Sequence, residues 1–229
     1  RKVLYSMAFT IYMVRHGQTF LNKYNRLQGW CDSPLTPKGM EDAHSAGRHL
    51  AHINFDHAYH SDTTRAMRTC RYILEENIAS NDITPKEIRN FREQSFGYFE
   101  GNDSSQVWTM LGAQHGGYRS YNELIANYSL GKTRDFLNEI DPFKDAETDE
   151  QYWARINAGF DHLRRHRQDG ENILLVSHSI TIRSIVDRFA PELGAAELGP
   201  RNGSVTKLIV SKDDIKVEYY NHHLDNETY

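Results

Sequence analysis

The chain has little cysteine, no long apolar run and no excess of positive charge. Its only cysteines, Cys31 and Cys70, are too few for a disulfide framework or a thiolate metal site, so we expect two free thiols in a reducing compartment. The longest aliphatic run, Ile173 to Val176, is far shorter than the ~20 residues of a membrane-spanning helix. A net charge of −4 argues against nucleic acid or an anionic membrane as the main partner.

The size and composition of the chain fit one globular α/β domain. Its 229 residues are 38% hydrophobic and 25% charged, and this length accommodates one domain with an insertion better than two domains. No secretory signal is recognisable after Arg1, where the sequence begins, and we expect a cytoplasmic protein. Because the chain as a whole is acidic, an anionic substrate has to be held by a local cluster of arginines.

Segments typical of strands alternate with segments typical of helices. We expect strands at 9–14, 58–60, 84–89, 172–176, 205–211 and 215–220, and helices at 37–51, 63–76, 148–168 and 179–189. Thr36 before Pro37 is a helix start, and Thr148 with Gln151 forms a capping box. The alternation predicts a three-layer α/β/α fold with a mostly parallel central sheet.

One stretch departs from this alternation. Residues 101–149 are rich in glycine, serine, asparagine and aromatic residues, have weak periodicity and end in an acidic run. We interpret them as a partly helical, lid-like insertion of a single domain that spans 1–229. The aromatic residues of the insertion serve either packing or substrate contact; they include Trp108, Tyr118, Tyr121 and Tyr128.

Two of the predicted buried strands end in a histidine, His16 after the first and His178 after the fourth. In sheets of this kind, ligands bind beyond the carboxyl ends of the strands. Arg15 adjoins His16, and Arg65 lies at the start of a predicted helix. One guanidinium group can donate two parallel hydrogen bonds to two phosphate oxygens, and helix N-termini supply further backbone N–H donors. The two histidines and two arginines therefore predict a site for a phosphorylated substrate.

Five segments, in order, resemble the histidine phosphatase superfamily, the phosphoglycerate-mutase-like group of the branch 1 type. They are Arg15-His16-Gly17-Gln18-Thr19 with Asn22; Gln28-Gly29-Trp30 with Asp32, Pro34-Leu35-Thr36 and Gly39; Ser61 to Ala66 with Thr69; Arg92-Glu93 with Phe96-Gly97 and Glu100-Gly101; and Val176-Ser177-His178 with Ile182-Arg183. An isolated Arg-His-Gly triplet is a weak signal, whereas five ordered segments between about 10 and 185 are specific.

The resemblance implies a role for each matching residue. His16 attacks phosphorus through a ring nitrogen and gives a phosphohistidine. Arg15, Arg65 and His178 neutralise the charge of the transferring phosphoryl group. Glu93 protonates the leaving oxygen and then takes a proton from the attacking water. The substrate-binding positions implied are Asn22, Gln28, Gly29, Gln18 and Ser179.

These residue types suit phosphoryl transfer without a metal or cofactor, and we expect neither. A neutral imidazole is available as a nucleophile near neutral pH, and fixed arginine and histidine donors neutralise phosphoryl oxygens. The other histidines, dense between 44 and 60 and paired at 222–223, match no familiar zinc spacing.

Three positions bear on how closely the family pattern applies. Glu100 lies near Glu93 and is the alternative acid. Ser179 stands where many relatives have glycine, so the backbone N–H is retained but a side chain is added where the chain approaches phosphate. Phe96 stands where mutase relatives tend to have tyrosine. The absence of that hydroxyl removes one contact with substrate.

The resemblance leaves three functions open. We expect a phosphatase that hydrolyses a phosphate monoester of a small metabolite, because the insertion has Arg119 and Arg134 apart and Pro142 as its only proline, unlike mutase insertions. A cofactor-dependent phosphoglycerate mutase, which must retain the phosphoryl group under a basic lid, is the first alternative. The second alternative, a non-catalytic binding module, is disfavoured because every catalytic position is present.

Overall fold

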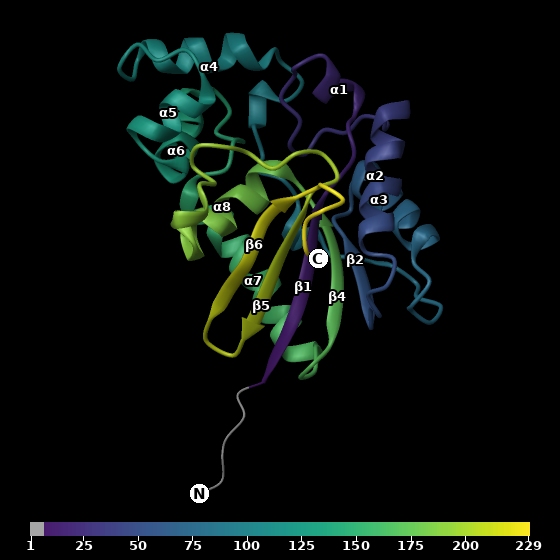
Figure 1. The fold of residues 1–229 in the computed structure, drawn as a ribbon. Helices are drawn as coiled ribbons and strands as arrows, with labels where there is room; N and C mark the ends of the chain where they lie inside the picture. Colours follow the sequence, from purple (N-terminus) through teal and green to yellow (C-terminus); the bar gives the residue numbers. More distant parts are fainter. Residues whose placement is uncertain (1–6) are drawn as a thin grey trace, which may run out of the picture.

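The structure is a computed structural model that describes residues 7–229. A six-stranded sheet has the strand order β3-β2-β4-β1-β5-β6 (Figure 1). The parallel strands are β1 (Ala8–Arg15), β2 (His57–His60), β3 (Lys86–Glu87) and β4 (Asn172–Ser177). Strand β5 (Val205–Ser211) pairs antiparallel with β1, and β6 (Ile215–His222) pairs antiparallel with β5. The predicted α/β fold with a mostly parallel sheet is confirmed.

Helices cover both faces of the sheet. Helices α2 (Pro37–His49) and α3 (Thr64–Glu76) cover one face, and α7 (Asp149–His166) and α8 (Ser179–Phe189) cover the other (Figure 1). Alternate residues of β1 point to opposite faces, so Tyr12 and Val14 pack in the α2–α3 core, and Ile11 and Met13 in the α7–α8 core. Burial on both faces explains why β1 and β4 are nearly continuous apolar runs.

The predicted helix starts are present at the expected residues. Thr36 caps α2 through Gly39 N–H with Pro37 in the first turn, and Thr148 forms a capping box with Gln151 at α7. Both helices end two residues earlier than predicted. Arg167, just after α7, has extended backbone angles, so the helical pattern cannot continue into 167–168.

Two elements differ from the prediction. Strand β3 is only Lys86–Glu87, because the chain turns into a 3₁₀ helix at Arg89–Phe91 and Pro85 has no N–H for the ladder. A short helix α1 (Phe20–Lys23), which the periodicity does not predict, follows the first signature segment. Two further 3₁₀ turns lie at Gly97–Phe99 and Pro191–Leu193. Within 7–229, no helix has the length and apolar character needed to cross a bilayer.

The predicted insertion contains three helices, α4 (Ser104–Ala113), α5 (Tyr121–Asn127) and α6 (Leu130–Ile140), beside the carboxyl end of the sheet (Figure 1). A buried arginine of α6 ties them to the core. The Arg134 side chain is 1% exposed and donates to Gln94 Oε1 (2.9 Å) and Ser184 Oγ (2.8 Å). It also pairs with Asp149 and lies 3.7 Å over the ring of Tyr152. That these helices form a lid on a single domain stays a prediction.

Arg134→Met tests this anchor. The variant keeps an unbranched chain of similar length but leaves buried polar partners unpaired. We expect the free energy of unfolding to fall by about 3 kcal/mol and the melting temperature to fall by about 6–12 °C. Thermal unfolding followed by circular dichroism measures the shift, with Arg165→Met, an exposed residue of α7, as control. Equal shifts in the two variants would contradict the anchoring role.

Candidate active site

The sheet brings His16 and His178 together. Strands β1 and β4 are neighbours, and Arg15 pairs in register with Ser177, so each strand delivers the histidine that follows it to the same edge. The two ring centroids are 5.2 Å apart, with His16 3% and His178 0% exposed. Both strands end at the carboxyl edge of the parallel sheet, where a ligand site is expected.

The protonation of His16 follows from its contacts. Its Nδ1 lies 2.7 Å from the carbonyl oxygen of Gly17, which can only accept, so Nδ1 carries the hydrogen and Nε2 carries a lone pair. Burial, and then the positive charges of Arg65 and Arg15, hold the pKa of His16 well below its usual value. His16 is therefore a neutral imidazole with a free Nε2 at neutral pH.

Gly17 has a packing reason to be glycine. A Cβ on this residue would lie 2.0 Å from the carbonyl oxygen of Gly39, in the first turn of α2. The Gly17 N–H donates to Thr69 Oγ1 (3.0 Å) on α3. The segment after His16 is thus held against both helices, and any larger residue would displace it.

Arg65 lies fully buried at the start of α3. One terminal nitrogen donates to Cys31 O (2.8 Å) and Asp32 Oδ1 (3.0 Å), and the other donates to Gly29 O (2.7 Å). These contacts fix the guanidinium plane. Its Nε is buried and has no hydrogen-bond partner among the described residues.

Arg15 and His178 each have a nitrogen that, like Arg65 Nε, lacks a hydrogen-bond partner among the described residues. Arg15 Nη1 donates to Pro200 O (2.8 Å), and His178 Nε2 lies 2.7 Å from Ser61 Oγ. Within residues 7–229, buried Arg15 Nε and His178 Nδ1 have no partner. Burial lowers the pKa of Arg15 to about 10, which still leaves it protonated at neutral pH. Burial and the charge of Arg65 hold the pKa of His178 well below its usual value.

Glu93 faces the first turn of α8. One carboxylate oxygen accepts from the N–H groups of Gln94 and Thr181, and the other accepts from Ile180 N–H at 2.9 Å. Burial raises the pKa of Glu93 and outweighs these hydrogen bonds, which act in the opposite direction. The Glu93 backbone carbonyl accepts from Arg155 on α7, so both ends of the residue are fixed.

Glu100, the alternative acid, is engaged in holding a loop. Its carboxylate oxygens accept from the backbone N–H groups of Gly29, Trp30, Cys31 and Phe96. These contacts shape the segment whose carbonyls bind Arg65, and Glu100 does not line the pocket at His16. The geometry therefore favours Glu93 as the acid.

A pocket of about 190 Å³ opens at His16. The lining residues come from the matching segments, from the short stretch between the first two of these segments, and from the insertion: Arg15, His16, Asn22, Arg26, Leu27, Gln28, Glu93, Phe96, Trp108, Tyr121, Ser179, Ile180 and Arg183. Among residues 7–229, no group of three or more His, Cys, Asp or Glu side chains is placed to hold a metal ion.

Three of the five predicted substrate-binding residues line this pocket: Asn22, Gln28 and Ser179. The other two are engaged elsewhere. Gln18 Oε1 accepts from Thr36 Oγ1 (2.8 Å) at the start of α2, and the Gly29 carbonyl binds Arg65. Arg65 and His178 are buried close to His16 and are not among the residues that line the pocket.

Some pocket residues had no predicted role. Arg183 belongs to a matching segment, but nothing in the sequence shows that it reaches the pocket. Arg26 gives no sequence signal at all. Of the insertion's aromatic residues, Trp108 and Tyr121 line the pocket, whereas Tyr118 and Tyr128 pack against the core beneath α4–α6.

The geometry defines a class of α/β protein in which two neighbouring strands end in paired buried histidines flanked by arginines. A family model described as the histidine phosphatase superfamily (branch 1) matches residues 11–223. The chain belongs to this superfamily.

The relatives include proteins of two kinds. The chain is 31% identical over 188 residues to 2,3-bisphosphoglycerate-dependent phosphoglycerate mutase 1 of Lactobacillus johnsonii, covering 76% of this chain and 80% of that protein. It is 37% identical over 106 residues to the fructose-2,6-bisphosphatase TIGAR of Mus musculus, covering 46% and 39% respectively. A solved phosphoglycerate mutase from Bacillus anthracis has a TM-score of 0.84 at 32% identity, over 95% of both chains. Family membership therefore leaves hydrolysis and mutase chemistry open.

Proposed function

We propose that the protein is a phosphatase that hydrolyses a phosphate monoester of a small metabolite through a phosphohistidine on His16. The observation that carries this proposal is a set of three buried nitrogens without a partner among the described residues: Arg15 Nε, Arg65 Nε and His178 Nδ1. Buried donors almost always have a hydrogen-bond acceptor. Three donors without one, close to a neutral histidine, favour binding of an anion with several oxygens.

In the first step, the lone pair of His16 Nε2 attacks phosphorus and forms the N–P bond. The P–O bond of the ester breaks, and its electron pair goes to the leaving oxygen, which takes a proton from Glu93. Arg15 and Arg65 neutralise the charge on the phosphoryl oxygens. With Ser61 donating to Nε2 of His178, the Nδ1 of His178 carries a hydrogen and donates to a phosphoryl oxygen.

In the second step, water attacks the phosphohistidine. Glu93, now ionised, takes a proton from that water, the N–P bond breaks, and its electron pair returns to His16. Inorganic phosphate leaves and Glu93 is again protonated. The raised pKa of Glu93 suits both roles, because the carboxyl keeps its proton to a higher pH than an exposed glutamate.

Hydrolysis is favoured over phosphoryl retention by the arginines of the insertion. Arg134 is buried in contacts with Gln94, Asp149 and Ser184, and Arg119 is exposed and does not line the pocket. The insertion therefore offers Trp108 and Tyr121 to the pocket instead of a cationic clamp. The volume of about 190 Å³ favours a small alcohol as the leaving group.

A phosphoglycerate mutase is the second candidate. The coverage of 95% and identity of 32% to a solved phosphoglycerate mutase favour it, as do Arg26 and Arg183 in the pocket. A mutase would transfer the phosphoryl group from His16 to another hydroxyl before water reached it.

One assay distinguishes phosphatase activity from mutase activity. The purified protein is incubated, with EDTA present, with p-nitrophenyl phosphate and separately with 3-phosphoglycerate, and both phosphate and 2-phosphoglycerate are measured. We expect phosphate release without added metal. Isomerisation of 3-phosphoglycerate with little free phosphate would replace the phosphatase proposal with the mutase. Loss of activity with EDTA would contradict metal independence.

The Tyr121 hydroxyl is expected to bind the leaving group. It is buried and has no partner within 7–229, burial raises the pKa of Tyr121 to about 12, and the residue lines the pocket. Tyr121→Phe should therefore lower kcat/KM about tenfold for esters whose alcohol carries a hydroxyl or carboxylate, with 3-phosphoglycerate first, because one hydrogen bond is lost. Phenyl phosphate, which has no such group, should be hydrolysed at an unchanged rate.

Tyr128→Phe is the matched control, because Tyr128 lies in the same insertion but packs against Phe136 away from the pocket. Melting temperatures of both variants should stay near that of the parent protein. An equal loss on 3-phosphoglycerate and phenyl phosphate in Tyr121→Phe would show that the hydroxyl acts on the fold, not on the leaving group.

A further inference from the structure

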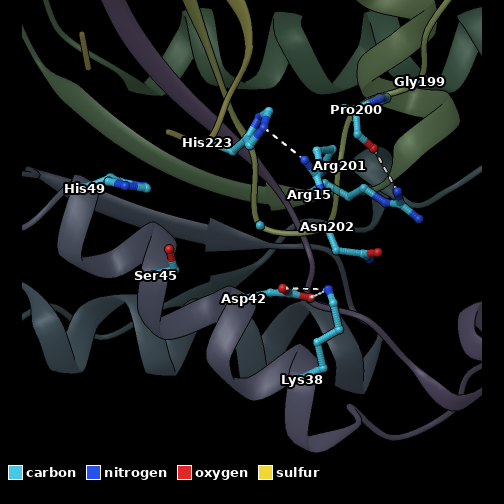
Figure 2. Close-up of a pocket in the computed structure, with 11 residues that line it drawn as sticks. Arg15, Lys38, Asp42, Ser45, His49, Gly199, Pro200, Arg201, Asn202 and His223 are labelled. Carbon is cyan, nitrogen blue, oxygen red and sulfur yellow. Dashed lines mark hydrogen bonds and ion pairs between the residues drawn. The ribbon is translucent and has the colours of Figure 1, made fainter. Parts of the chain in front are cut away.

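A second pocket, larger than the one at His16, lies between α2 and the segment 199–203 (Figure 2). Its volume is about 480 Å³, against about 190 Å³ for the pocket at His16. Helix α2 contributes Lys38, Asp42, Ser45 and His49, which recur every three or four residues and so share one face of the helix. We call it the α2 pocket.

The charge of the α2 pocket is opposite to that of the whole chain. Arg15, Lys38 and Arg201 line it with Asp42 as the one carboxylate among its lining residues, so the formal charge is three minus one, or +2. The chain carries −4. A local excess of positive charge in an acidic protein raises the concentration of anions at that point.

The carboxylate in the α2 pocket is already satisfied. Asp42 Oδ2 accepts from Gln18 N–H (3.0 Å), and Oδ1 lies 3.1 Å from Lys38 Nζ. Arg201 forms no ion pair with any carboxylate in the part of the chain described here, and its contact is with His223 Nε2 at 3.2 Å (Figure 2). Since a guanidinium cannot accept, His223 accepts here and Arg201 keeps its other N–H donors.

Segment 199–203, which forms one wall of the α2 pocket, is hydrogen-bonded to Arg15 and His16. Pro200 O accepts from Arg15 Nη1 (2.8 Å), and Asn202 Nδ2 donates to the carbonyl oxygen of His16 (3.0 Å). Gly203 N–H donates to Arg15 O (2.8 Å). An occupant of the α2 pocket would therefore contact a segment that holds both Arg15 and His16.

We propose that the α2 pocket is a binding site for a small phosphorylated metabolite with at least two negative charges, separate from the substrate being hydrolysed. The ligand's oxygens bind Arg201 and Lys38, and Ser45 supplies an uncharged donor. Because Arg15 lines both pockets, an anion in the α2 pocket weakens the attraction of Arg15 for the phosphoryl group of the substrate. The ligand is therefore an inhibitor. The inhibition rests on the function proposed above, whereas the binding does not.

Direct binding is tested with methylenediphosphonate, whose P–C–P link resists hydrolysis, by calorimetry on protein whose catalytic pocket is filled with vanadate. We expect one equivalent to bind per chain. Arg201→Gln removes a cation and Ser45→Glu adds a carboxylate to the α2 pocket, and each should weaken binding at least about tenfold. Arg165→Gln, which removes one exposed charge on α7, should leave binding unchanged.

The effect on catalysis is measured separately, with p-nitrophenyl phosphate as substrate. We expect methylenediphosphonate to compete with substrate at the catalytic pocket as well, and this competitive inhibition should be the same in the parent protein and the variants. A second, saturable component that lowers kcat/KM about fivefold and leaves residual activity is expected only where the α2 pocket is intact.

Two results would overturn the proposed site. One is no binding to the vanadate-filled protein; the other is equal affinity in the parent, Arg201→Gln and Ser45→Glu. Binding without the second kinetic component would retain the site and reject the inhibition. Melting curves of both variants check folding. Absence of hydrolysis in the parent protein would count against the phosphatase proposal alone, because the calorimetric arm does not use turnover.

Discussion

Asparagine in place of His16 is expected to lower phosphate release from p-nitrophenyl phosphate at least about 10⁴-fold, because no other group supplies the nucleophile. Asparagine is smaller than histidine but keeps a polar side chain that can donate to Gly17 O, so the fold should survive. The parent protein, quenched in alkali during turnover, should carry an alkali-stable and acid-labile phosphoryl group. Peptide mapping should place that group on His16, and His16→Asn should carry none.

His60→Asn is the matched control. His60 is also a buried histidine at the end of a parallel strand, and its Nδ1 lies 2.7 Å from the next residue's carbonyl oxygen, as in His16. It does not line the pocket, so its replacement should change stability more than turnover. Labelling of the parent protein on a residue other than His16, or equal losses in the two variants, would contradict the assigned nucleophile.

The comparison of His16 with His60 also shows what the sequence predicts well. Strand β1 is predictable because both of its faces are buried and its residues are almost all apolar, and the caps at Thr36 and Thr148 mark helix starts by local chemistry. Which strand end carries the site is not local. Both β1 and β2 lie next to β4 in the sheet, so only the ordered family segments distinguish His16 from His60.

The side-chain contacts of the candidate site could not be predicted in the same way. Gln18 and Gly29 lie in matching segments, yet their polar groups are used within the protein, by Thr36 and Arg65. Tyr121 reaches the pocket from an insertion whose sequence has weak periodicity. The partners of a polar atom depend on segments far apart in the chain, and a sequence segment records only which atoms are available.

The second large effect is expected for Glu93→Gln, which should slow hydrolysis of the phosphohistidine much more than its formation. Nitrophenolate is a good leaving group that needs little protonation, so formation of the phosphohistidine should continue. Hydrolysis of the phosphohistidine lacks its base, and steady-state turnover should fall about 10²–10³-fold. Rapid-mixing experiments should therefore show a burst of one nitrophenolate per active site, followed by a slow phase, with the phosphoenzyme accumulating on His16.

The pH profile gives an independent measure of Glu93. Burial raises its pKa, so the folded protein holds this proton more tightly than an unfolded chain does, and the acid form is lost as the pH rises through that raised value. For an alkyl phosphate, which needs a protonated leaving oxygen, kcat should fall on the alkaline side in the parent protein. The glutamine variant should lose this descending limb, because its amide does not titrate.

Glu100→Gln distinguishes the two carboxylates. Three of the four backbone N–H groups bound by Glu100 belong to the loop whose carbonyls hold Arg65, so this variant should melt earlier and bind substrate more weakly. It should not accumulate phosphohistidine, because the base for its hydrolysis is still present. A burst with Glu100→Gln and none with Glu93→Gln would assign the acid to Glu100. Glu93 would then serve to bind the N–H groups of Gln94, Ile180 and Thr181, the last two at the start of α8.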